Sequence, residues 1–216
     1  MLASTPYLLF VGFALAAAFT PGPAVMLSIH NAMHFGWRSA LWSSLGNISG
    51  LLALTLLSVL GLDALLRASE LAFDVVKACG AGYLIWLGVQ QWRKASRPVA
   101  PAVSTAGNAR PPRIARPARA LYTRGLTVAL TNPKAIAFIA ALFPQFLTLS
   151  RPMAPQYVAL TATFMAISLL ALSSYAGLAV LARRRLGVWF ASGWPQRLSG
   201  TVFIGFGVGL LRLHRA

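Results

Sequence analysis

The sequence predicts an all-α membrane protein of six transmembrane helices, arranged as two inverted three-helix repeats with breaks in helices 1 and 4. Three observations favour this fold class. First, the 216 residues are 57% hydrophobic and only 10% charged, whereas charged residues make up about 25% of a typical soluble domain. Second, six apolar runs approach or exceed the length of about 20 residues that spans a bilayer. Third, two of these runs are interrupted by proline.

The six spans follow one another along a single membrane domain, residues 1–216. We expect them over residues 6–29, 40–62, 71–92, 121–149, 156–182 and 198–213. The segment 93–120 between the third and fourth spans is rich in Arg, Pro, Ala and Ser and has no acid. Because this segment shows no periodic apolar face, it is predicted to be a flexible loop.

The first apolar run is predicted to be a transmembrane helix. No basic segment precedes it, and further apolar runs follow it, so a cleaved signal peptide is not expected. The single cysteine, Cys79, excludes an intrachain disulfide and a CxxC metal or redox motif. We interpret Cys79 as a small buried apolar residue.

The distribution of Lys and Arg predicts how the spans are oriented. The connections 1–2, 3–4 and 5–6 share one side and carry 13 of these residues, against four at the opposite ends. Basic residues concentrate in cytoplasmic loops. The segment 93–120 is therefore predicted to be cytoplasmic, with both termini outside.

Lys134 lies near the midplane in this arrangement. The fourth span begins after Arg124, and roughly ten residues of helix reach the middle of the bilayer. A lysine at that depth costs about 2.5–3.5 kcal/mol on insertion scales, and helix packing alone does not require a charge. Asn47 in the second span is expected at a similar depth.

A weak internal repeat relates the two interrupted spans. Residues 18–24 (AFTPGPA) align with residues 129–135 (ALTNPKA). Because each repeat holds three spans, the second copy is inverted relative to the first. Inverted repeats whose broken helices meet at the midplane are typical of secondary transporters.

The two breaks are the predicted substrate site. Half-helix ends carry partial charges that suit the carboxylate and ammonium groups of an amino acid, and Lys134 can neutralise the carboxylate. The candidate substrate-binding residues are Thr20, Pro21, Gly22, Pro23, Asn47, Asn132, Pro133 and Lys134. Asp74 and Lys77, three residues apart on the third span, are candidates for ion coupling or, equally, form an interfacial ion pair.

Other classes of function are disfavoured. The net charge of +16 comes from basic clusters between apolar runs, such as residues 183–185. This distribution favours contact with anionic lipids at the cytoplasmic face over nucleic-acid binding. His30 and His34 can share a helix face, but a metal site needs further ligands. We therefore expect no metal, no cofactor and no catalytic residues.

Several short motifs together resemble the lysine-exporter/homoserine–threonine-exporter (LysE/RhtB) family along essentially the whole chain, with the greatest likeness to homoserine and homoserine lactone exporters. They are residues 19–23 (FTPGP), 36–38 (GWR), 80–88 (GAGYLIWLG), 130–134 (LTNPK) and 143–146 (FPQF). The resemblance implies proton-driven export of amino acids such as homoserine or threonine, or of derivatives, from the cytoplasm. It also implies a compact six-helix protein of the bacterial inner membrane, with a homodimer as one arrangement.

One departure from the family pattern concerns the fifth span. Members often carry an aspartate several residues before a Tyr-Ala pair, whereas here Tyr175-Ala176 is preceded by Ser168. This leaves Asp74 as the carboxylate for proton coupling. The remaining alternatives are an exporter of another small solute or a cation, an intramembrane enzyme and a membrane scaffold.

Overall fold

The computed structural model describes residues 5–68, 70–95, 116–147, 151–181 and 192–212, and within these ranges it is helical with no strand. The elements are α1 (Thr5–Phe19), α2 (Pro23–Phe35), α3 (Trp37–Ala68), α4 (Glu70–Ala95), α5 (Ala118–Leu130), α6 (Pro133–Leu142), the 3₁₀ turn η1 (Phe143–Phe146), α7 (Met153–Leu181) and α9 (Trp194–Arg212). The all-α fold class predicted from the sequence is confirmed.

Both predicted helix breaks are present. The axes of α1 and α2 meet at 51°, and those of α5 and the segment from Pro133 to Phe146 meet at 53°. Proline occupies the first position of α2 and of α6, where its missing N–H leaves no hydrogen bond unmade and its fixed φ favours helix. The same prolines cannot continue the preceding helix, so each apolar run divides in two.

Two helical segments of the described chain are long and apolar enough to cross a membrane unaided. They are Trp37–Val59 of α3 and the whole of α7. The two bent pairs raise this number to four if each pair is one span. The helices α4 and α9 occupy the ranges predicted for the third and sixth spans, but the described residues of neither meet this test.

The helices are longer than predicted at several ends. The segment predicted as a loop over residues 93–120 is helical at both edges, because α4 continues to Ala95 and α5 begins at Ala118. Of the rest, Arg116 and Pro117 precede α5, and residues 96–115 lie outside the described part of the chain.

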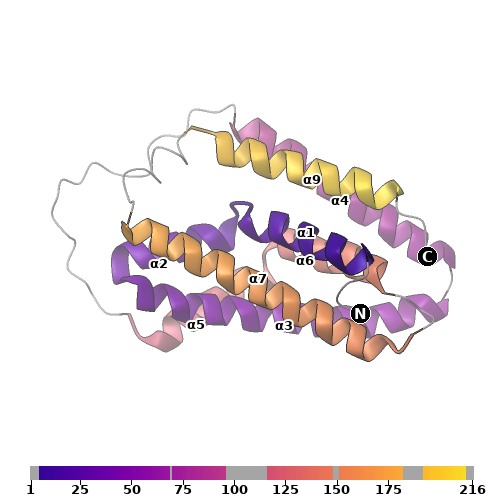
Figure 1. The fold of residues 1–216 in the computed structure, drawn as a ribbon, viewed down its shortest axis with the longest axis horizontal. Helices are drawn as coiled ribbons and strands as arrows, with labels where there is room; N and C mark the ends of the chain where they lie inside the picture. The colour runs from indigo at the N-terminus through magenta and orange to yellow at the C-terminus, as the bar shows by residue number, and fades with distance from the viewer. Residues whose placement is uncertain (1–4, 69, 96–115, 148–150, 182–191, 213–216) are drawn as a thin grey trace.

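The helices lie roughly along one common axis, the long axis of Figure 1. α4 and α9 pack side by side along one edge, and α3 packs against α5 along the opposite edge (Figure 1). α1, α6 and α7 lie between these edges (Figure 1). The start of α1 and the end of α9 lie toward the same end of the molecule, opposite the end where α2 meets α3, as an even number of crossings requires (Figure 1).

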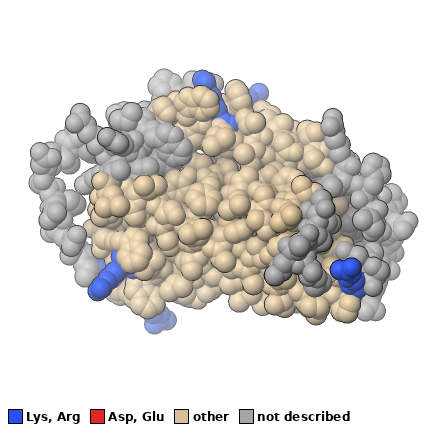
Figure 2. Space-filling view, in the orientation of Figure 1, with Lys and Arg blue, Asp and Glu red and all other residues tan. Residues whose placement is uncertain are grey.

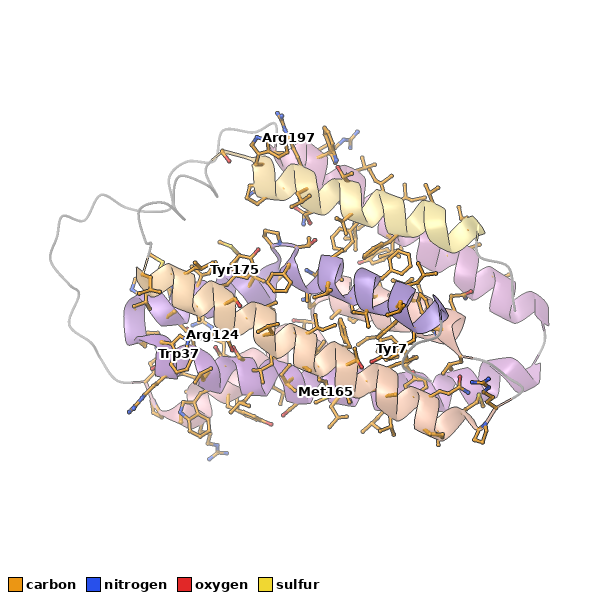
Figure 3. The ribbon with its side chains drawn as sticks, viewed as in Figure 1. Tyr7, Trp37, Arg124, Met165, Tyr175 and Arg197 are labelled. Atoms are coloured by element: carbon orange, nitrogen blue, oxygen red, sulfur yellow. The ribbon has the colours of Figure 1, made fainter. Side chains whose placement is uncertain are left out.

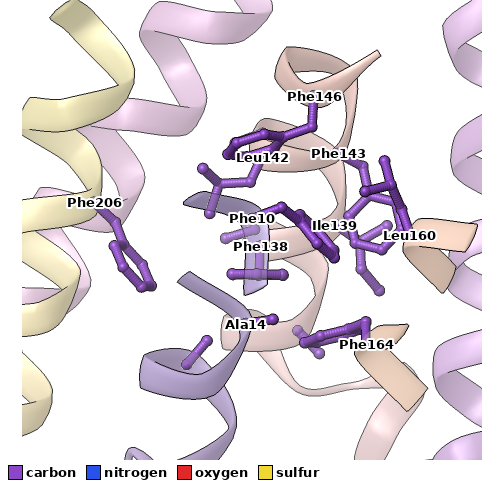
Figure 4. Packing of buried hydrophobic residues seen from close by; sticks show 14 of the residues in the cluster. Phe10, Ala14, Phe138, Ile139, Leu142, Phe143, Phe146, Leu160, Phe164 and Phe206 are labelled. Atoms are coloured by element: carbon purple, nitrogen blue, oxygen red, sulfur yellow. The ribbon is translucent and has the colours of Figure 1, made fainter. Parts of the chain in front are cut away.

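The buried core consists of two clusters. The larger is rich in aromatic rings, six of which we call the phenylalanine cluster: Phe10, Phe138, Phe143, Phe146, Phe164 and Phe206. Figure 4 shows these side chains converging from α1, α6, η1, α7 and α9. The smaller cluster joins α2, α3 and α7 through mostly small residues such as Ala32, Ala40 and Ala176.

Charged side chains avoid the middle of the face drawn in Figure 2. On the face shown in Figure 2, Lys and Arg lie only near the margins, and a broad uncharged band runs between them. Many large apolar residues of this protein are exposed, among them Leu56, Leu57, Val158 and Leu181. Exposed leucine and valine in such numbers suit a lipid environment and are costly in water.

Candidate functional site

Lys134 connects the two broken helix pairs. Its ammonium donates a hydrogen bond of 2.6 Å to the backbone carbonyl of Thr20, directly after α1. Its backbone N–H donates to the Asn132 side chain at 3.1 Å, which caps the start of α6. The Asn132 cap and Pro133 thus fix the first turn of α6 so that the Lys134 side chain reaches across to the other break.

The carbonyl partner of Lys134 explains how a lysine is held among apolar helices. The last carbonyls of a helix have no intrahelical partner and carry the negative end of the helix dipole. The Lys134 ammonium, which is partly buried, binds one of these groups and also lies 5.8 Å from the centre of the Phe203 ring. We expected either a substrate carboxylate or an acidic side chain here, and the structure provides a backbone carbonyl.

Tyr175 on α7 binds the same end of α1. Its hydroxyl donates to the carbonyl of Phe19 at 2.7 Å, and Figure 3 shows it beside the first break. Two consecutive carbonyls, those of Phe19 and Thr20, are therefore bound by side chains from two other helices. From the sequence, Tyr175 was notable only as part of a family motif, and its contact with α1 was not predicted. A tyrosine within an apolar run could have indicated such a contact, because a buried tyrosine hydroxyl usually has a hydrogen-bond partner.

A small cavity of about 40 Å³ lies between the breaks. Its lining comprises Ala17, Ala18, Gly22, Ala24, Val25, Asn47, Leu51, Asn132, Lys134, Ala135, Phe138, Phe164, Ser168 and Leu172. Four of the predicted substrate-binding residues, Gly22, Asn47, Asn132 and Lys134, are brought together here. This volume accommodates water molecules, which need about 10–15 Å³ each by this kind of measure, and is too small for an amino acid.

The other four predicted residues do not line the cavity. Thr20 contributes its carbonyl to Lys134, and its hydroxyl bonds to the Ala16 carbonyl one turn earlier. Pro21 and Pro23 shape the first break. Pro133 faces a different space, a groove of about 420 Å³ between α4 and α6. The prolines create the breaks, and their neighbours line the cavity.

The helix ends around the cavity give it a defined electrostatic pattern. α2 and α6 both begin at the breaks, so their positive ends and their first free N–H groups lie beside the cavity, near Ala24, Val25 and Ala135. The negative end of α1 also borders the cavity, near Ala17 and Ala18. Together with Lys134, this arrangement suits a zwitterion and disfavours a metal cation.

Gly22 allows the close approach of Lys134. A Cβ atom on Gly22 would lie 3.4 Å from the lysine Nζ, at the edge of ordinary contact. A larger side chain would compete with the ammonium for this space. Gly22 therefore belongs to the site because it leaves room for the ammonium.

The predicted ion-coupling pair remains untested by these contacts. Asp74 and Lys77 lie on the backbone of α4, but their side chains fall outside the described residues. Cys79, which we expected to be buried, is exposed and borders the groove between α4 and α6.

The two histidines of α2 are neighbours, as predicted. The His30 and His34 rings lie 4.4 Å apart. Among the described residues, no three His, Cys, Asp or Glu side chains come together in a way that could hold a metal ion.

The fold and this cavity define a class: an all-helical membrane protein whose polar site lies between two broken helices. A family model described as "LysE type translocator" matches residues 15–214. The chain belongs to the LysE family of translocators, which are efflux transporters and not enzymes.

Curated relatives agree with this assignment. A homoserine/homoserine lactone efflux protein of Salmonella typhimurium is 36% identical over 79% of this chain and 76% of its own length. A leucine efflux protein of Klebsiella pneumoniae is 31% identical over 96% and 95%. An uncharacterized membrane protein of Vibrio cholerae is 32% identical over 94% of both chains. No solved structure matches the chain.

Proposed function

We propose that this protein exports small neutral amino acids or their derivatives, of the homoserine and threonine type, from the cytoplasm across the bacterial inner membrane. The observation that carries the proposal is the Lys134–Thr20 hydrogen bond, which joins the two broken helices at a cavity bordered by helix ends of both signs. The curated relatives are named for efflux of homoserine and of leucine. These two amino acids differ in their side chains and share the ammonium and carboxylate groups that such a cavity suits.

Substrate binding is an exchange of partners at Lys134. The substrate carboxylate takes the ammonium from the Thr20 carbonyl and adds the free N–H groups at the start of α2 and α6. A charged acceptor forms a stronger hydrogen bond with an ammonium than a neutral carbonyl does. The substrate ammonium is then placed toward the carbonyl end of α1. This exchange removes the contact that holds α1 to α6 in the structure.

The small cavity requires that binding be accompanied by movement. At about 40 Å³ it cannot contain an amino acid, so the two broken pairs must separate when substrate enters. Six spans in two inverted repeats, with one repeat rocking against the other, provide such a movement. The phenylalanine cluster then closes the outer side of the site and opens for release.

The proposal extends to the coupling ion, the orientation and the surroundings of the protein. Export is driven by exchange with protons, with Asp74 and Lys77 as the ion-coupling residues. Both termini lie outside, anionic lipids contact the arginine-rich cytoplasmic face, and two copies of the chain associate as a homodimer. Reconstitution with and without a proton gradient tests the coupling.

The experiment for the proposed function is amino-acid efflux from preloaded vesicles that contain the purified protein. We expect gradient-dependent efflux of homoserine, threonine or leucine, and its loss in Lys134→Ala. Arg197→Ala, which removes an exposed arginine near the start of α9, is the matched control and retains transport. If the wild-type vesicles show no efflux of any neutral amino acid, the proposed function is wrong.

A further inference from the structure

Asn31 on α2 is a buried amide without a partner. Its side chain is 0% exposed, and neither its Oδ1 nor its Nδ2 has a hydrogen-bond partner among the described residues. Buried side-chain amides are nearly always hydrogen-bonded, because an unsatisfied polar group destabilises the fold. A group of this kind indicates a ligand that is bound during part of the working cycle.

The position of Asn31 relates it to the cavity. Positions 24, 28 and 31 recur at the spacing that places side chains on one face of a helix. Ala24 lines the cavity, and the Ser28 hydroxyl is occupied by the Leu172 carbonyl at 3.0 Å. Asn31 therefore lies about 10 Å beyond Ala24, toward the end where α2 meets α3.

The opposite end of the cavity is closed by apolar rings. Phe138 and Phe164 line the cavity and stack with centroids 4.8 Å apart. Phe143 packs against both, with centroids 6.3 and 5.9 Å away, and Phe10 packs against Phe143 at 5.3 Å. A polar solute has no hydrogen-bonding group in this phenylalanine cluster, whereas the α2 side offers an amide.

The end of the molecule where α2 meets α3 also carries positive charge. Figure 3 places Arg124 and Trp37 at the end where α2 meets α3, and Tyr7 toward the other end. Arg116 lies 5.4 Å over the ring of Phe35, the last residue of α2. Guanidinium groups at this end attract carboxylates and raise their local concentration.

From these observations we infer that Asn31 forms a second substrate subsite between the cavity and the end of the molecule where α2 meets α3. The ligand class is a small zwitterion, because one primary amide offers both donors and an acceptor and can bind a carboxylate oxygen or an ammonium. This inference rests on the proposed function, since the ligand is the amino acid that the transporter exports. It adds a place where the substrate binds before it reaches Lys134.

The test is Asn31→Leu, a variant of similar size that has no polar group. The subsite predicts that the apparent KM for internal substrate rises about three- to tenfold, the loss expected for one hydrogen bond. Thermal stability stays the same or increases, because an unpartnered buried amide is removed. Ile29→Leu, a buried apolar exchange on the same helix, is the control, and Asn31→Ser is expected to be intermediate in KM.

A purely structural Asn31 gives a different result. Asn31→Leu would then transport with the wild-type KM, and this outcome overturns the subsite while efflux by the wild type leaves the proposed function intact. If Asn31→Leu does not fold, the KM of Asn31→Ser decides, with an unchanged value again contradicting the subsite.

A second measurement needs no transport kinetics. The chain has a single cysteine, Cys79, so Asn31→Cys in a Cys79→Ser background carries one thiol. We expect a small hydrophilic alkylating reagent to modify this thiol, and saturating homoserine, threonine or leucine to slow the reaction severalfold. A thiol that does not react, or one whose rate is the same with and without each amino acid, contradicts the subsite.

Discussion

The close packing of α3 against α5 makes Gly125→Ala the substitution whose consequence the structure defines best. A Cβ atom on Gly125 would lie 2.0 Å from the Ser43 carbonyl oxygen, whereas ordinary contact begins at 3.4 Å. Because the obstacle is a backbone atom on the facing helix, it cannot rotate away. The two helices must separate by about 1.4 Å, the difference between these distances.

This separation has a cost in stability. Overpacking in a tight interface costs about 1–3 kcal/mol, partly offset by the gain of up to about 1 kcal/mol that alanine has over glycine within a helix. For a protein of this size, we expect Tm in detergent to fall by roughly 2–8 °C. Transport is also affected, because α3 carries Asn47 while α5 leads into the break before Lys134.

The control for this prediction is Gly177→Ala on α7. A Cβ there meets no atom within 4 Å, so the same chemical change should leave Tm unchanged or raise it slightly. Both variants are compared by thermal unfolding and by vesicle efflux. If Gly125→Ala is as stable and as active as Gly177→Ala, the helix contact and the reasoning built on it are wrong.

Two further substitutions test other contacts of the site. Tyr175→Phe removes the hydroxyl that donates to the Phe19 carbonyl. This variant should be less stable by about 1 kcal/mol, measured as Tm, and should show a lower initial rate of efflux. Unchanged values would show that this hydrogen bond contributes nothing. Phe138→Ala removes a ring that belongs to both the cavity lining and the phenylalanine cluster, and should allow amino acid to leak from vesicles without a gradient. The control Phe35→Ala, outside the cluster, should not leak. Equal leak in the two variants would contradict an apolar closure at Phe138.

The sequence was sufficient to predict the features that covalent chemistry imposes locally. Proline cannot continue a helix and suits its first turn, so Pro23 and Pro133 revealed both breaks and the starts of α2 and α6. Lys134 was recognised because a charge inside an apolar run is costly. In the structure it lines one cavity with Gly22, Asn47 and Asn132, and their role in substrate binding stays a prediction.

The contacts across the breaks could not be predicted. Every break frees several carbonyls, and the sequence does not say which of them a distant side chain reaches, so the Lys134–Thr20 bond and the Tyr175–Phe19 bond appear only in three dimensions. Asn31 was not singled out from the sequence, because its burial depends on neighbours from other helices. The exposure of Cys79 depends on neighbouring helices in the same way. We expected this residue to be buried, and it is exposed.

The central claim, that Lys134 binds the substrate carboxylate, is tested most directly by a double-mutant cycle between protein and substrate. Equilibrium binding of a neutral amino acid and of its carboxamide to the purified protein is measured, in the wild type and in Lys134→Ala. The account predicts that the wild type prefers the carboxylate by about tenfold or more, as a charge-assisted hydrogen bond of at least about 1.4 kcal/mol implies, and that Lys134→Ala loses this preference. An equal preference in both proteins would contradict it, because the carboxylate would then bind elsewhere.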